Sequence, residues 1–181
     1  SMILKTTLAA AAALSLVACA STAPAPVFSQ ASLPDAVKVP AGHKVAMETV
    51  GVGEITYECR DKKDAPGQTE WVFVGPEAKL LDRAGKTVGR YYGPPATWLS
   101  TDGSAVTATQ LAVAPAGAGN IPLQLVKANP ATGMGAMTGV TYIQRVATVG
   151  GVAPSAPCTA ATKGQKQIVK YQADYILYKA S

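Results

Sequence analysis

Hydrophobic and polar residues alternate along much of the chain after residue 50, a pattern typical of β-strands with one buried face. The clearest run covers residues 54–60, where Ile55, Tyr57 and Cys59 share one side and polar residues occupy the other. The last run covers residues 167–178. Its predicted core face consists of Val169, Tyr171, Ala173, Tyr175 and Leu177.

Further short runs predict strands at residues 70–74, 87–92, 97–99, 105–113, 121–128 and 138–148. Glycine, proline and aspartate separate them, as in Gly93-Pro94-Pro95 and Asp102-Gly103-Ser104, and these residues favour turns. Residues 76–81 predict a short helical turn with Pro76 at its first position. No stretch has the pattern of a long amphipathic helix. We therefore expect a single-domain, all-β antiparallel sandwich or barrel of about nine strands.

The first 18 residues have the pattern of a secretory signal peptide. Ser1 precedes Met2 and is interpreted as an expression scar, Lys5 is the positive residue, and residues 8–18 form an apolar run. That run is shorter than the roughly 20 apolar residues that a membrane-spanning helix needs. The pattern predicts export.

The segment Leu16-Val17-Ala18-Cys19 resembles the bacterial lipobox, in which the cysteine is lipidated and becomes the first residue. Cleavage as an ordinary signal is the alternative, because Ala18 and Ala20 also fit a small-x-small site. The lipobox resemblance implies an outer-membrane lipid as partner, through Cys19, because Ala20 replaces the aspartate associated with inner-membrane retention. The expected location is the periplasmic face of the outer membrane or the cell surface, or the periplasm or medium without lipidation.

Small residues and prolines dominate the stretch that follows, so residues 19–38 are expected to form a flexible tether. The folded domain is expected over residues 39–181. Cys59 and Cys158 are the two cysteines left in it, and in an oxidising compartment they are most simply a disulfide. No C-x-x-C motif is present, and the single histidine does not suggest a zinc site.

The composition limits the classes of function. The 181 residues carry a net charge of +5, with 48% hydrophobic and 15% charged residues, which suits one globular domain and excludes general disorder. The basic residues are dispersed among acidic ones, as in Asp61-Lys62-Lys63-Asp64, so no nucleic-acid partner is expected. There is no complete dinucleotide fingerprint, P-loop or EF-hand, and we expect no cofactor and no metal.

The region Val88-Gly89-Arg90-Tyr91-Tyr92-Gly93-Pro94-Pro95-Ala96-Thr97-Trp98, with Trp71-Val72-Phe73 and Ile143-Gln144-Arg145-Val146, resembles an uncharacterised secreted or lipoprotein family. This family, domain of unknown function 3455, is related to spherulin-like proteins. The resemblance covers roughly residues 33–178 and implies no established activity. Family members often carry a histidine where this chain has Tyr91, and an extra residue precedes Trp98 here.

Two kinds of site are suggested by the residues. Aromatic side chains near an arginine can stack on a small molecule or glycan, which gives weak ligand-binding candidates: Tyr57, Arg90, Tyr91, Tyr92, Trp98 and Asp102. The same aromatic residues also suit the packing of a core. A small hydrolase would need His43 as base beside Asp102 and Ser104, although the two turn residues more often bond local backbone. We therefore expect a non-catalytic binding or structural, stress-related module, with a small hydrolase-type enzyme as the alternative.

Overall fold

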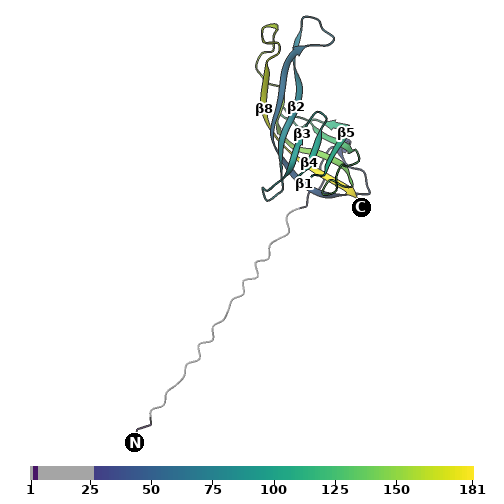
Figure 1. The fold of residues 1–181 in the computed structure, drawn as a ribbon, viewed down its shortest axis with the longest axis vertical. Helices are drawn as coiled ribbons and strands as arrows, with labels where there is room; N and C mark the ends of the chain where they lie inside the picture. Colours follow the sequence, from purple (N-terminus) through teal and green to yellow (C-terminus); the bar gives the residue numbers. More distant parts are fainter. Residues whose placement is uncertain (1, 4–26) are drawn as a thin grey trace.

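The computed structural model describes residues 2–3 and 27–181, and the predicted all-β fold is confirmed. Most of the predicted signal sequence, Cys19 and residues 20–26 of the predicted tether lie outside these residues, whereas residues 27–38 of the tether are described. Eight antiparallel strands form one sheet: β1 (His43–Asp61), β2 (Thr69–Leu81), β3 (Thr87–Tyr92), β4 (Thr97–Ser100), β5 (Ala105–Ala114), β6 (Leu123–Ala128), β7 (Val140–Gly150) and β8 (Lys166–Ala180). Each strand pairs with the next, and β1 also pairs with β8, so the sheet closes in a ring (Figure 1).

One local prediction is wrong, because residues 76–81 belong to strand β2 and form no helical turn. Glu77 pairs with Tyr92 of β3, and the segment alternates as a strand, with Ala78 and Leu80 buried inside the ring. In the described part of the chain the helices are two short 3-10 turns, η1 (Asp35–Val37) and η2 (Ala160–Thr162). None of these described helices has the length and apolar character to cross a membrane.

Strands β1, β2 and β8 extend together beyond the ring and form a three-stranded projection (Figure 1). We call this projection the arm: residues 55–61 of β1 in the middle, 69–76 of β2 on one side and 166–170 of β8 on the other. Its inner face continues the inner face of the ring, because Ile55, Tyr57 and Cys59 keep the predicted alternation and are all buried.

The predicted disulfide is present between Cys59 and Cys158, which are 99 positions apart in the sequence. It holds the connection between β7 and β8 against the inner face of the arm. Two side chains of β2 bond the same connection: Trp71 Nε1 donates to the Ala156 carbonyl (2.8 Å) and Thr69 Oγ1 donates to that of Cys158 (2.7 Å). The disulfide thus fixes a long connection to the outer part of the arm.

Apolar residues are buried on both sides of the sheet. The larger cluster fills the ring and includes Leu80, Trp98, Ile143, Tyr175 and Leu177. The smaller cluster lies between the outer face of the sheet and residues 28–39, which precede the first strand. Its members are Val37, Val39, Ala114, Leu125, Val146, Ile176 and Tyr178.

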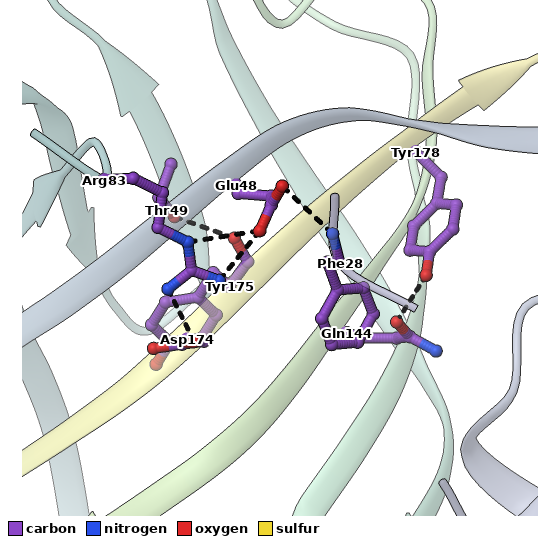
Figure 2. A network of polar contacts seen from close by, with 8 residues as sticks. All are labelled: Phe28, Glu48, Thr49, Arg83, Gln144, Asp174, Tyr175 and Tyr178. Carbon is purple, nitrogen blue, oxygen red and sulfur yellow. Dashed lines mark hydrogen bonds and ion pairs between the residues drawn. The ribbon is translucent and has the colours of Figure 1, made fainter. Parts of the chain in front are cut away.

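Polar contacts attach residues 28–39 to the outer face. The Phe28 backbone N–H donates to Glu48, whose other carboxylate oxygen accepts from Arg83 (Figure 2). Buried Gln144 accepts from the Tyr178 hydroxyl (2.8 Å) and donates to the Val37 carbonyl (2.9 Å). These bonds satisfy a fully buried amide, which would otherwise cost free energy, and they place the start of the domain across β7 and β8.

Candidate functional site

The wall of the ring divides the predicted ligand-binding residues into separate groups. Tyr57, Tyr91 and Trp98 point inward and are buried in the main core. Arg90 and Tyr92 are neighbours on the outer surface, where the Arg90 guanidinium lies 5.2 Å from the centre of the Tyr92 ring. Asp102 lies in the turn between β4 and β5. The six residues therefore do not form one site.

Arg90 borders a groove on the outer face of β8, β1, β2 and β3, with a volume of about 570 Å³. Its guanidinium is already bound, because Nε donates to Glu77 Oε1 (3.1 Å). Lys79, Lys170 and Glu54 also line the groove, so its charges are mixed. This surface has no strong preference for a ligand of either sign.

Asp102 fixes the turn that contains it. Its Oδ1 accepts from the backbone N–H (2.9 Å) and the hydroxyl (2.6 Å) of Ser104, and Oδ2 accepts from the Ala136 N–H (2.7 Å). These bonds, that of the Ser104 side chain above all, hold the pKa of Asp102 well below its usual range. The carboxylate therefore remains charged in mild acid and continues to join the β4–β5 turn to the residues before β7.

The residues of the hydrolase alternative have separate partners. His43 Nδ1 is 2.9 Å from Thr141 Oγ1, and the imidazole packs edge-on against Tyr142. The Ser104 hydroxyl donates to Asp102 and accepts from the Met137 N–H (3.0 Å). No hydrogen bond in the described part of the chain joins His43 to either, so these contacts do not form the relay of a serine hydrolase.

Inside the ring, aromatic side chains from four strands form a continuous cluster. Tyr91 lies between two neighbours, with its ring centre 4.8 Å from that of Trp98 and 4.7 Å from that of Tyr175. The hydroxyls of Tyr171 and Tyr175 are 3.0 Å apart, and the Tyr57 hydroxyl donates to the Gly151 carbonyl (2.6 Å). We call these five residues, together with Arg145, the tyrosine–arginine cluster.

Arg145 lies on the inner face of β7 because it is directly opposite Tyr175 of β8. It is only partly buried, and its Nε donates to the Pro122 carbonyl (3.0 Å). The other arginines of the described chain all bind carboxylates: Arg60 binds Glu58, Arg83 binds Glu48 and Asp174, and Arg90 binds Glu77. Arg145 has no such partner in residues 2–3 and 27–181, and its two Nη groups bond no acceptor there.

Burial raises the pKa of all four tyrosines of the cluster, and the positive charge of Arg145 acts on each in the opposite direction. The hydroxyls are therefore neutral at physiological pH and can donate hydrogen bonds. The bond between Tyr171 and Tyr175 uses one of their two hydroxyl hydrogens. Trp98 Nε1 is a buried donor with no acceptor among the described residues.

Among the described residues the cluster therefore keeps unused hydrogen-bond donors, the Trp98 Nε1–H and the Nη groups of Arg145, which has no carboxylate partner there. Such an arrangement suits a ligand with oxygen acceptors and negative charge, because a guanidinium binds carboxylate and phosphate groups in a fixed, two-pronged geometry. The groups around it, four phenolic rings and an indole, are flat and largely apolar, and each is at most 8% exposed.

Arg145, Tyr171 and Tyr175 are absent from the site predicted from the sequence. All three belong to strands that were predicted, and Tyr171 and Tyr175 were assigned to the core face. Arg145 follows Gln144 in a strand where polar residues occur on both faces, so periodicity gives no side for it. Its only sequence signal is the presence of a charge within a strand otherwise rich in apolar residues.

No three histidine, cysteine, aspartate or glutamate side chains gather as a metal site in the part of the chain that the structure describes. Residues 40–179 match the family described as "Protein of unknown function (DUF3455)". No curated protein and no solved structure matches the chain significantly.

Proposed function

The chain belongs to the DUF3455 family, and from this starting point we propose that it is an exported, lipid-anchored envelope protein that binds a small anionic ligand without catalysis. The site is the tyrosine–arginine cluster. The observation that carries this proposal is the guanidinium of Arg145, which has no carboxylate partner in residues 2–3 and 27–181, beside buried tyrosines whose hydroxyls are neutral. A carboxylate or phosphate group would receive hydrogen bonds from the Nη groups, and an aromatic or other flat substituent would contact the rings.

Export is supported by the signal pattern of residues 1–18 and by the Cys59–Cys158 disulfide, a bond that persists in oxidising compartments. Lipid anchoring is supported by the lipobox around Cys19. The stretch between Cys19 and Phe28 would then separate the lipid from the first residues that contact the sheet.

The intact mass of the chain, isolated from the membrane fraction of cells that process lipoproteins, tests the anchor. We expect a chain that begins at Cys19, carries covalent lipid and contains two hydrogens fewer than the reduced form because of its disulfide. Replacing Cys19 by serine should release the protein from the membrane. An unlipidated mature chain would contradict the anchor, and free thiols at Cys59 and Cys158 would contradict export.

Binding can be measured with inorganic phosphate and with benzoate, which combines a carboxylate and an aromatic ring, by calorimetry or by the NMR shift of the Arg145 Nε–H. We expect benzoate to bind more tightly than phosphate because it contacts the rings as well as the guanidinium. Arg145→Gln should weaken binding of both at least about tenfold, which corresponds to about 1.4 kcal/mol. Arg145→Lys should retain part of the affinity, because the charge remains but the two-pronged geometry is lost.

Arg60→Gln is the matched control. Arg60 is also an arginine on a strand, but it is half-exposed and bound to Glu58 on the arm. Equal affinity in the Arg145→Gln and Arg60→Gln variants, or no binding of either probe to the unaltered protein, would contradict the proposed site. Thermal unfolding of each variant separates a loss of binding from a loss of folding.

A further inference from the structure

The arm leaves one strand edge without a partner. Residues 69–73, 75 and 76 of β2 pair with β1 on one side, with Val74 as an unpaired bulge residue, whereas pairing with β3 on the other side begins only at Glu77. No backbone hydrogen bond from the rest of the described chain reaches the free side of residues 69–75. The β3–β4 turn lies against Gly75, through Gly93 and Pro94. β2 therefore has an open edge about six residues long, 69–74, which projects away from the ring (Figure 1).

The register shows which groups this edge presents. Cys59 directs its N–H and C=O toward the β8 side, where they bond Gln165 and Gly164. Trp71 is directly opposite Cys59. Because Cys59 bonds on its β8 side, the two residues form a non-hydrogen-bonded pair, in which the N–H and C=O groups of each residue point away from the other strand. The N–H and C=O of Trp71 therefore point outward, and so do those of Phe73, two residues along the same strand.

The two edges of the arm differ in their protection against pairing. Lysine, proline and covering loops commonly protect exposed edges. The β8 edge has Lys166 and Lys170, and the Gly151 N–H bonds the Lys170 carbonyl. Residues 70–74 of β2, Glu-Trp-Val-Phe-Val, contain neither lysine nor proline, their one protecting feature is the bulge at Val74, and the Phe73 side chain is 52% exposed. This segment has the composition of a strand that is paired.

We propose that this edge pairs antiparallel with the same edge of a second copy of the chain, about a two-fold axis at Val72. In that register Trp71 is opposite Phe73 of the second copy, and Phe73 is opposite its Trp71. Each of these two positions forms two backbone hydrogen bonds, and the aromatic side chains form cross-strand pairs on the inner face. Glu70, the one charged residue of 70–74, faces Val74 of the second copy, so no like charges meet.

Self-complementarity of this kind favours a second copy over an unrelated strand as the occupant. The contact is short, so the dimer should be weak, with a dissociation constant in the micromolar range. The proposed dimer contact contains no residue of the tyrosine–arginine cluster. Ligand binding can therefore fail while dimerisation holds, and dimerisation can fail while ligand binding holds.

Sedimentation velocity of the full exported chain, from roughly 5 to 500 µM, tests the dimer. We expect reversible dimerisation that weakens at least about tenfold in Phe73→Lys, which places a charge at each cross-strand pair. Phe73→Pro should have the same effect for a different reason: it removes an outward N–H and leaves the bonds between β2 and β1 intact.

Ile168→Lys is the control, because Ile168 is a similarly exposed apolar residue (60%) on the arm but belongs to β8. It should leave dimerisation unchanged. A monomer at every concentration would overturn the proposal, and so would unchanged dimerisation in both Phe73 variants. Equal weakening by Ile168→Lys would show general apolar association instead of edge pairing. Circular dichroism at low concentration verifies that each variant is folded.

Discussion

Removing the disulfide, in the variant that replaces both Cys59 and Cys158 by alanine, is expected to lower the free energy of unfolding by about 4–5 kcal/mol. The bond joins residues 99 positions apart, and opening a loop of that length restores a large conformational entropy to the unfolded chain. Urea denaturation gives this value directly. The corresponding fall in the melting temperature is about 10–20 °C.

The folded state should change little in this variant. Several contacts besides the disulfide keep the β7–β8 connection on the arm, among them the bonds of Trp71 and Thr69 to it and the two backbone bonds of Cys59 to Gly164 and Gln165. Alanine is chosen because Cys59 is fully buried and a serine hydroxyl would need a new partner. Trp71 fluorescence in the folded state serves as the control for this connection.

A loss below about 1 kcal/mol would contradict the entropic account and would mean that the reduced, unfolded chain remains compact. Reduction of the unaltered protein should produce nearly the same loss as the double substitution. A much larger loss in the variant would instead show that the sulfur atoms contribute through packing in the arm.

Period-two patterns were sufficient to locate most of the strands, but not to describe both faces of the last one. In β8 the predicted core face, which includes Tyr171 and Tyr175, is the inner face of the ring. Ile176 and Tyr178 lie on the opposite face and are also buried, because residues 28–39 cover them. Periodicity within one strand contains no information about a distant segment that packs on its outer side.

Strand pairing determines both that the ring closes and which residues meet in the tyrosine–arginine cluster. The sequence of one strand alone does not specify its partners. Arg145 joins Tyr175 because β7 and β8 align at that register, and Tyr91 joins them because the ring is closed through β1. The helical turn predicted at Pro76 failed for a related reason. The pairing of Glu77 with Tyr92 of β3, a tertiary contact, extends the strand past a residue that often begins a helix.

Trp98→Ala is expected to lower the free energy of unfolding by about 3–5 kcal/mol, measured by urea denaturation. Trp98 is 1% exposed and contacts both Tyr91 and Tyr175, so alanine would leave a cavity in the middle of the ring. The short strand β4 that carries it cannot easily move to fill that space, because it pairs on both sides.

Trp98→Phe separates packing from binding. It keeps most of the aromatic surface and removes the buried Nε1–H, which has no acceptor among the described residues, so its cost should be well below that of Trp98→Ala. Because that N–H is one of the unused donors of the tyrosine–arginine cluster, Trp98→Phe should nevertheless weaken benzoate binding. Unchanged affinity in this variant would assign Trp98 to packing alone, whereas weaker binding with nearly full stability would place its indole nitrogen in the ligand site.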